Sequence, residues 1–221
     1  MIVTIDGPAG AGKSSAARLL AERLGFEFLD TGAMYRAVTV AAIRTGCDTL
    51  DETALNKLLD NMRLEMPVSK VLLDGEDITS TIRAPEVTRA SAAIADSPIV
   101  RRRLVGWQRT IAAGRDIVCE GRDQGTIVFP DAGCKFFLVA EPEERARRRH
   151  RELVSRGESI ALEAVLESQK QRDARDAARD IAPMVPAGDA VILDTTALGL
   201  DEVIATMEQE VRRRMPRKDV R

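Results

Sequence analysis

One octapeptide constrains the fold of this chain more than any other feature, the run Gly-Pro-Ala-Gly-Ala-Gly-Lys-Ser at residues 7–14. It matches the pattern G-x-x-x-x-G-K-[ST] in full. A β-rich run at residues 2–5 precedes it, and a helical pattern at residues 17–24, stopped by Gly25, follows it. In this order the backbone N–H groups of the loop and the helix N-terminus can surround an anion. The motif therefore predicts a site for a nucleoside triphosphate.

The side chains of this phosphate loop have distinct expected roles. Lys13 can reach the β- and γ-phosphates, and the Ser14 hydroxyl is the expected ligand of Mg²⁺. The same run does not fit G-x-G-x-x-G, which disfavours a nicotinamide-binding fold. The chain has no N-K-x-D element for guanine, which argues against a small GTPase. The residues expected to bind ATP are the whole loop and the residue after it: Gly7, Pro8, Ala9, Gly10, Ala11, Gly12, Lys13, Ser14 and Ser15.

Chain length and charge restrict the possible classes further. The 221 residues suffice for one α/β domain with a small insertion but not for two large domains. The 33 Lys and Arg nearly balance the 35 Asp and Glu, which argues against disorder and against general coating of nucleic acid. No apolar run approaches the roughly 20 residues of a membrane span, and no leader precedes the first strand, so a cytoplasmic location is expected.

The remaining reactive residue types form no recognisable site. Cys47, Cys119 and Cys134 contain no C-x-x-C pair, so reduced thiols are expected rather than a disulfide framework or a zinc site. His150 is the only histidine, and without a partner triad or metal-ligand spacing it is expected at the surface. Arginine dominates the cations, because only six of the 33 are Lys, and its guanidinium group matches phosphates.

Strand and helix patterns alternate along most of the chain, which favours an α/β fold with a parallel sheet. A single domain over residues 1–221 is expected, with a small antiparallel insertion near residues 63–95 and a lid region near residues 148–172. Further strands are expected at 26–29, 116–120, 135–140 and 191–193, and helices near 33–44, 52–61, 98–113, 142–156, 159–180 and 200–214.

A short motif at residues 30–36 follows the second predicted strand. The carboxyl ends of parallel strands border the ligand crevice of such folds. Thr31, Tyr35 and Arg36 are therefore placed where they can face a substrate. Alternatively, Thr31 caps the following helix and Arg36 is solvated.

Arg122 and Asp123 lie between two glycines directly after the strand at residues 116–120. Their position indicates a tight loop that faces a ligand. An Arg–Asp ion pair within a turn is the alternative. One of the three arginines at residues 101–103 could reach the same crevice, while the others remain in water.

A further polar cluster lies in the predicted helix at residues 159–180. Arg172, Arg175, Asp176 and Arg179 are spaced i, i+3, i+4 and i+7, which places them on one helix face. The alternative is a solvated face whose ion pairs each contribute about 0.2–0.5 kcal/mol. We favour a functional interpretation, because phosphoryl transfer depends on positioning and on neutralising the charge of the transferred group.

A second arginine-rich helix precedes this one and ends at Gly157. Such a segment can act as a lid that closes over the triphosphate, with Arg148 as its expected contact with ATP. A surface helix with solvated charges is equally compatible with the pattern. The arginines of this helix are Arg145, Arg147, Arg148, Arg149 and Arg151.

Together these motifs resemble the bacterial cytidylate kinase family, a group of nucleoside monophosphate kinases. The resemblance implies an α/β P-loop kinase core with a five-stranded parallel sheet, a small antiparallel monophosphate-binding insertion and a short helical lid. It also implies transfer of the γ-phosphate of ATP to CMP or dCMP with Mg²⁺, in a monomer whose partners are these small molecules and neither a nucleic acid polymer nor a membrane. The matching segments are residues 7–14, 30–36, 98–101, 108–109, 121–131, 172–179 and 182–183.

The resemblance also assigns roles to individual residues. Lys13, Arg122, Arg172 and Arg179 are the implied catalytic residues. The chain departs from the family pattern at Ala92, where a base-contacting serine is favoured; either Ser91 substitutes through a local shift, or one pyrimidine contact is missing. The implied acceptor contacts are Arg36, Arg122 and Arg179 to the phosphate, Arg101 and Asp123 to the cytosine edge, Arg172 and Asp176 to the sugar, with Thr31 and Tyr35 lining the pocket.

Two other functions stay open at this point. A kinase for a sugar or a shikimate-like alcohol would need a positioned carboxylate as general base, for which Asp30 is the candidate. A regulatory module that uses ATP as a switch would hydrolyse it slowly, without acceptor-dependent turnover. The abundance of arginine favours an acceptor that is already ionised, because such an acceptor needs cations rather than a base.

Overall fold

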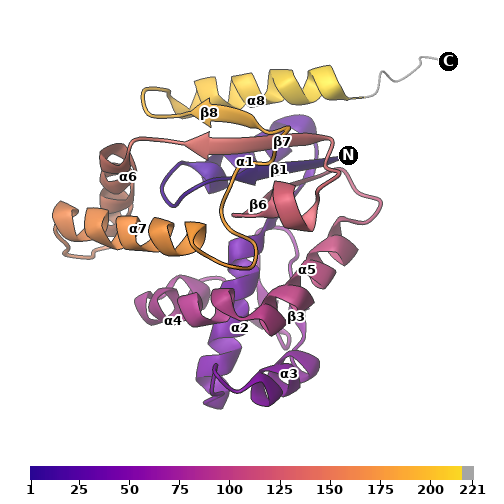
Figure 1. Ribbon diagram of the computed structural model, residues 1–221, viewed down its shortest axis with the longest axis vertical. Coiled ribbons are helices and arrows are strands. Elements are labelled where there is room, and N and C mark those ends of the chain that lie inside the picture. Colours follow the sequence, from indigo (N-terminus) through magenta and orange to yellow (C-terminus); the bar gives the residue numbers. More distant parts are fainter. Residues whose placement is uncertain (216–221) are drawn as a thin grey trace. The chain divides into compact units, whose positions relative to one another are not determined.

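The computed structural model describes residues 1–215, which form two compact units. One unit comprises Met1–Phe28 and the chain from Arg115 onward, and the other comprises Leu29–Gly114. Figure 1 shows the course of the chain through both. The elements are β1 (Ile2–Asp6), α1 (Lys13–Leu24), β2 (Glu27–Asp30), α2 (Thr31–Thr45), α3 (Glu52–Asn61), β3 (Leu64–Glu65), β4 (Leu72–Leu73), β5 (Glu76–Asp77), the 3-10 helix η1 (Thr81–Arg83), α4 (Pro85–Asp96), α5 (Pro98–Ala112), β6 (Ile117–Glu120), the π-helix η2 (Gln124–Val128), β7 (Cys134–Val139), α6 (Pro142–Ser155), α7 (Leu162–Ala177), β8 (Val191–Asp194) and α8 (Leu200–Arg214).

The five-stranded parallel sheet that the resemblance implied is confirmed, and its strand order is β2-β6-β1-β7-β8. Strand β1 pairs with β6 through Val3 and Val118 and with β7 through Ile5 and Phe136. These strands are apolar on both faces, so helices must cover both sides. Because the strands are parallel, Asp6 at the end of β1 and Glu120 at the end of β6 lie at the same edge of the sheet.

Helices α1 and α8 pack together against this sheet. Their buried side chains, among them Leu20 of α1 and Met207 of α8, form one apolar cluster with Val3, Phe136 and Leu138. Each fully buried side chain of this size contributes about 1.5–3 kcal/mol to the stability of the fold. The packing fixes the N-terminus of α1, and with it the phosphate loop, against the carboxyl ends of the strands.

Helices α6 and α7 pack against each other through a small core of their own. Ala146 and Leu153 of α6 contact Val165 of α7 there. Helix α7 ends at Ala177. The predicted helix to residue 180 was therefore too long, and Arg179 follows the helix instead of sharing its face.

The second unit contains α2, α3, α4 and α5 around a core that includes Met34 and Leu104. The expected antiparallel sheet within residues 63–95 is confirmed as β3-β4-β5. The rest of that range is helical, because α4 has Pro85 at its first turn and buries Val87 and Ile94 on one side. None of the helices in residues 1–215 combines the length and hydropathy that a membrane span requires.

Candidate active site

The phosphate loop depends on backbone conformations that only glycine adopts easily. Gly7, Gly10 and Gly12 have φ values of 136°, 78° and 88°. A Cβ atom at Gly7 would lie 2.1 Å from the Leu138 carbonyl oxygen, so no side chain fits between the loop and β7. Gly12 leads directly into α1, and the first intrahelical bond there runs from the Ala16 N–H to the Gly12 carbonyl at 3.0 Å. The N–H groups before Ala16 are thus available to an anion.

Lys13 is buried at the base of this loop. Its ammonium group donates to the Pro8 carbonyl at 2.7 Å. The pKa of Lys13 is lowered from 10.5 to about 7, chiefly by burial and also by the cations Arg122 and Arg172, while the negative charges of Glu120 and Asp6 oppose the shift. The loop therefore holds a cation that an anionic ligand would stabilise in its charged form.

Ser14 and two carboxylates occupy the sheet edge next to the loop. The Ser14 hydroxyl donates to Glu120 Oε1 at 2.6 Å. Asp6 is 4% exposed and accepts hydrogen bonds from the N–H groups of Gln124 and Gly125 at 2.9 and 2.8 Å. Burial raises the pKa of Asp6 to about 6, although both N–H groups oppose this.

Sequence reasoning did not select Asp6 or Glu120 as site residues. The available signal was an acidic residue at the last position of an otherwise apolar strand, since both strands end this way. Asp6 fixes the segment that follows Asp123, which forms a π-helix rather than a simple tight loop. Asp123 itself is 4% exposed.

Three arginines surround the carboxylate of Asp176, which is 5% exposed. Arg179 Nη2 lies 2.7 Å from Oδ1, and Arg122 Nε lies 3.1 Å from Oδ2. Arg172 Nε is farther away, at 3.8 Å. The structure thus brings these predicted residues together, but Arg175 of the same predicted helix face is exposed and belongs to solvent. Arg122 pairs with Asp176, a partner that lies outside its own turn.

Arg145 and Asp173 hold the phosphate loop from the other side. The Arg145 guanidinium donates to the Ala9 carbonyl at 3.0 Å and is ion-paired with Asp173, whose Oδ1 lies 3.4 Å from the Ala9 nitrogen. Gln169 is buried and lies next to the loop. A Cβ atom at Gly10 would lie only 2.8 Å from its Nε2, so glycine is needed at this position. Asp173 and Gln169 were not predicted as site residues, since nothing in their spacing indicated a contact with a loop more than 150 residues away.

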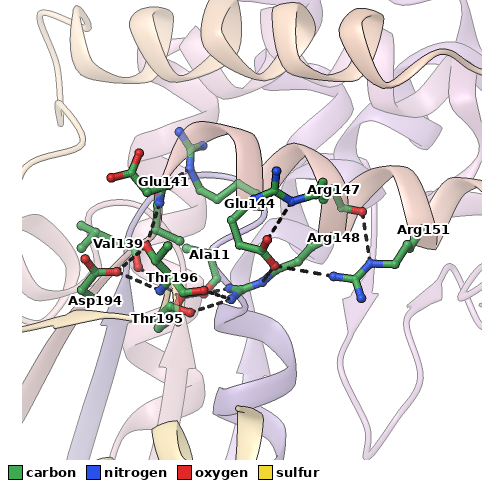
Figure 2. A network of polar contacts seen from close by, with 12 residues as sticks. Ala11, Val139, Glu141, Glu144, Arg147, Arg148, Arg151, Asp194, Thr195 and Thr196 are labelled. Atoms are coloured by element: carbon green, nitrogen blue, oxygen red, sulfur yellow. Dashed lines mark hydrogen bonds and ion pairs between the residues drawn. The ribbon is translucent and has the colours of Figure 1, made fainter. Parts of the chain in front are cut away.

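Arg148 is part of α6, and its side chain reaches the segment after β8, as Figure 2 shows. Its guanidinium donates to the Thr195 hydroxyl at 3.0 Å, to the Thr195 carbonyl at 2.6 Å and to Glu144 at 3.1 Å. A Cβ atom at Gly12 would lie 4.0 Å from its Nη1. The predicted ATP-binding arginine is therefore beside the phosphate loop and anchored.

The second unit contains its own polar cluster around the start of α2. Asp30, not Thr31, caps this helix by accepting from the Ala33 N–H at 2.8 Å. The same carboxylate lies 3.3 Å from Arg36 Nη2 and 3.9 Å from Arg83 Nη2. The solvated Arg36 that the sequence allowed is thus not observed.

Arg101 and Tyr35 form the second part of that cluster. Arg101 is 5% exposed, lies with its guanidinium carbon 5.7 Å from the centre of the Tyr35 ring and donates to the Ala95 carbonyl at 3.1 Å. Thr31 is 2% exposed. Ser91 donates to the Thr88 carbonyl at 2.9 Å within its own helix.

The three cysteines and His150 have none of the contacts with the phosphate loop or the arginine clusters that are described above. All three cysteines are free thiols, as expected, and burial raises the pKa of Cys119 and Cys134. His150 Nε2 lies 3.0 Å from the Ile160 carbonyl and is half-buried rather than at the surface. Within residues 1–215, no group of three or more His, Cys, Asp or Glu side chains could hold a metal ion by itself.

A parallel five-stranded sheet with this glycine-rich loop between β1 and α1 defines a P-loop protein that binds a nucleoside triphosphate. The model of the cytidylate kinase family matches residues 3–213, and the chain belongs to that family. A cytidylate kinase of Rhodopirellula baltica is 51% identical over 203 residues, which cover 92% of this chain and 89% of that protein. One of Pelotomaculum thermopropionicum is 47% identical, with 91% and 92% covered.

A solved structure supports the fold alone. The uncharacterized protein from Eubacterium ventriosum ATCC 27560 matches with a TM-score of 0.53 at 13% sequence identity. The match covers 96% of this chain and 98% of that one.

Proposed function

We propose that this chain transfers the γ-phosphate of ATP to CMP or dCMP, which yields ADP and CDP or dCDP. The observation that carries the proposal is the group of three guanidiniums around the single carboxylate of Asp176. These three cations lie around one anion, in the unit that also holds the phosphate loop. Arg122 and Arg172 are close enough to the loop to lower the pKa of Lys13. This arrangement suits a second phosphorylated substrate.

In the proposed reaction, a phosphate oxygen of the acceptor attacks the γ-phosphorus of ATP. The bond from this phosphorus to the β,γ-bridging oxygen breaks, and ADP leaves with that electron pair. An ionised phosphate needs no general base, so the protein has to position two polyanions and reduce their repulsion. Lys13 would neutralise charge on the donor, and Arg122, Arg172 and Arg179 would neutralise charge on the acceptor and the transferred group.

The sheet edge contains oxygen donors suited to Mg²⁺. The Ser14 hydroxyl and the Glu120 carboxylate are adjacent at 2.6 Å, and hydroxyl and carboxylate oxygens are ligands that this ion prefers. Mg²⁺ commonly binds through one or two protein groups together with substrate phosphates, so no complete protein cage is needed. We propose that Ser14 is its ligand and that Glu120 orients the hydroxyl; the bound ion would supply charge neutralisation to the phosphates.

We propose the residues that bind the acceptor nucleoside from the family resemblance and from two clusters, the one around Asp176 in the first unit and the one around Asp30 in the second. Asp123 and Arg101 would bind the cytosine edge, and Arg172 and Asp176 the sugar. Arg36 has a buried Nε with no hydrogen-bond partner in residues 1–215, as expected of a group that binds a ligand. The residues proposed for the acceptor phosphate and pocket are Arg36, Arg122, Arg179, Thr31 and Tyr35.

Other elements have proposed roles in the same cycle. We propose that the range 63–95 contributes to monophosphate binding and that residues 148–172 form the lid. A monomer that works in the cytoplasm is also proposed. The engagement of Asp30 weighs against an alcohol kinase, because its carboxylate caps α2 and lies beside two arginines instead of standing ready to take a proton.

A coupled assay of ADP release with ATP and Mg²⁺ tests the function. CMP and dCMP should give high turnover, UMP, AMP and GMP much less, and shikimate none above the background of hydrolysis. Turnover with shikimate would indicate an alcohol kinase, and slow hydrolysis that no acceptor accelerates would indicate an ATP-dependent switch.

The variant Asp123→Ala tests the base contact within the same assay. Its ratio of kcat/KM for CMP to that for UMP and AMP should fall, since the buried carboxylate is proposed to bind the cytosine edge. An unchanged ratio would remove Asp123 from the base site.

A further inference from the structure

Strand β8 ends beside a buried threonine that joins three parts of the first unit. Thr195 is 2% exposed, and its N–H donates to the Val139 carbonyl of β7 at 2.8 Å. Its hydroxyl oxygen lies 3.2 Å from the Ala11 carbonyl of the phosphate loop and 3.1 Å from the Val139 carbonyl. The single hydroxyl proton is therefore shared between the sheet and the loop.

The same hydroxyl oxygen accepts a hydrogen bond from Arg148, as Figure 2 shows. Arg148 Nη1 donates to this oxygen, Nη2 donates to the Thr195 carbonyl, and Nε donates to Glu144. All three guanidinium nitrogens thus have a fixed partner. A long arginine side chain normally samples many rotamers, whereas this one is held in a single orientation.

The anchored guanidinium faces the start of α1. Nη1 of Arg148 is the atom that a Cβ at Gly12 would meet first, at 4.0 Å. Gly12 directly precedes Lys13 and Ser14, whose backbone N–H groups belong to the first turn of the helix. Nη1 has two N–H groups, and the Thr195 hydroxyl accepts a hydrogen bond from this nitrogen, so the other N–H can serve a phosphate bound at the loop.

The neighbouring threonine shows that the Thr195 hydroxyl is not needed for the local turn. Asp194 Oδ1 accepts from the N–H and the hydroxyl of Thr196, at 2.8 and 2.6 Å, and this closes the turn after β8. Thr196 Oγ1 also accepts from the Glu141 N–H at 3.0 Å. The contacts of Thr195 with Ala11 and Arg148 therefore lie outside that turn.

We propose that Thr195 is a positioning residue of the donor-nucleotide site. Its hydroxyl holds Arg148 beside the phosphate loop and fixes the Ala11 carbonyl at the same time. Thr195 itself does not touch the nucleotide, and it acts on ATP through Arg148. The inference rests on the proposed function, because it assumes that ATP binds at the loop.

Calorimetric titration with Mg-ATP and, separately, with CMP tests this role. Thr195→Val keeps the shape of the side chain but removes the hydroxyl, and it should raise the Kd for ATP about tenfold while the Kd for CMP stays within about twofold. Thr195→Ser restores the hydroxyl and should restore the affinity. The matched control is Thr206→Val, because the Thr206 hydroxyl donates to the Glu202 carbonyl on the exposed face of α8.

A double-mutant cycle with Arg148→Ala tests whether Thr195 acts through this arginine. In the Arg148→Ala background, Thr195→Val should cause no further loss of ATP affinity. Fully additive losses would overturn the proposal. If the wild-type protein does not bind ATP, the proposed function fails; if it binds ATP and Thr195→Val binds equally well, only the inference about Thr195 fails.

Glu144→Ala provides a second variant if Thr195→Val unfolds. It removes the anchor at Nε of Arg148 while Thr195 remains intact. A several-fold rise in the Kd for ATP with unchanged CMP binding is expected. Unchanged affinity for ATP would contradict the proposal that Arg148 must be held in place.

Discussion

Two carboxylates in the first unit each hold three arginines, but the two clusters are built differently. Glu144 is on α6, and its partners all come from the same helix: Arg147, Arg148 and Arg151. Asp176 is on α7, and its partners come from three segments, the loop after β6, α7 itself and the chain after α7: Arg122, Arg172 and Arg179.

The difference between these clusters is mainly one of burial. The Asp176 side chain is 5% exposed, and those of Arg179, Arg122 and Arg172 are 11%, 18% and 47% exposed. The Glu144 side chain is 19% exposed, and those of Arg148, Arg147 and Arg151 are 25%, 55% and 71% exposed. Water screens such pairs, and each contributes only about 0–1 kcal/mol. The buried cluster around Asp176 is screened less, so removal of one of its charges leaves the others uncompensated in a poorly solvated place.

Removal of Asp176 should have the largest effect. Asp176→Ala leaves Arg122 and Arg179 without their buried counter-charge, so the free energy of unfolding should fall by about 3 kcal/mol. Turnover with CMP should also fall strongly, because the arginines lose their orientation. Urea unfolding and the coupled assay measure both effects. In urea unfolding, Glu144→Ala is the matched control and should cost no more than about 1 kcal/mol of stability; equal losses of stability for both variants would refute the comparison.

Arg179→Ala should have the next largest effect, and it should be confined to the acceptor. The KM for CMP is expected to rise about a hundredfold, because a charged contact to the phosphate is lost. The Kd for ATP should change less than about threefold. Arg175→Ala is the control, since Arg175 belongs to the same motif but is exposed. If Arg179→Ala weakens ATP and CMP equally, damage to the fold explains the loss instead.

The contrast between these two arginines also shows what the sequence could predict. Helical spacing correctly grouped Arg172 and Asp176, but it grouped Arg175 and Arg179 with them on equal terms. Helix α7 ends at Ala177, and only the chain beyond it turns Arg179 back toward Asp176. Where a helix ends depends on tertiary contacts as well as on local pattern, so this distinction was out of reach.

The phosphate loop, by contrast, was predictable because it depends on local sequence rather than on tertiary contacts. Its chemistry depends on backbone conformations within eight consecutive residues, and glycine at fixed positions reports them directly. The contacts that support the loop could not be predicted, because Asp173 and Thr195 reach it from more than 150 residues away. Helix α4 was not predicted although Pro85 stands at its first turn, because the whole range 63–95 was assigned to an antiparallel insertion.

The buried cluster should also control the ionisation of Lys13. In the free protein, the pKa of Lys13 is lowered to about 7, and in the unfolded chain it returns to 10.5. Below pH 7 the lysine is charged in both states, so its burial lowers the free energy of unfolding by the full amount. This destabilisation decreases as the pH rises from 7 to 10.5, where the lysine is neutral in both states. Bound phosphates should raise the pKa again. ADP binding at pH 8 should thus take up close to one proton, which calorimetry in buffers of different ionisation enthalpy can measure.

Arg122→Ala sharpens this test, because Arg122 is the charged group that lowers the pKa of Lys13 most. Without this arginine, Lys13 should be more protonated before ADP binds, and the uptake at pH 8 should decrease. Arg147→Ala, from the exposed cluster, should leave the uptake unchanged. An uptake that does not differ among the three proteins would show that the buried cluster does not act on Lys13.

Arg151→Ala should have the smallest effect of all. Its guanidinium lies 3.6 Å from Glu144 and is 71% exposed, so the free energy of unfolding should change by no more than about 0.5 kcal/mol. Even this difference should vanish in 1 M salt, where the Debye length is about 3 Å. Arg148 also pairs with Glu144, yet Arg148→Ala should clearly lower the affinity for ATP. If Arg151→Ala impaired ATP binding to the same degree, helix α6 would act as a general field of positive charge, and the specific anchoring of Arg148 by Thr195 would be irrelevant to ATP binding.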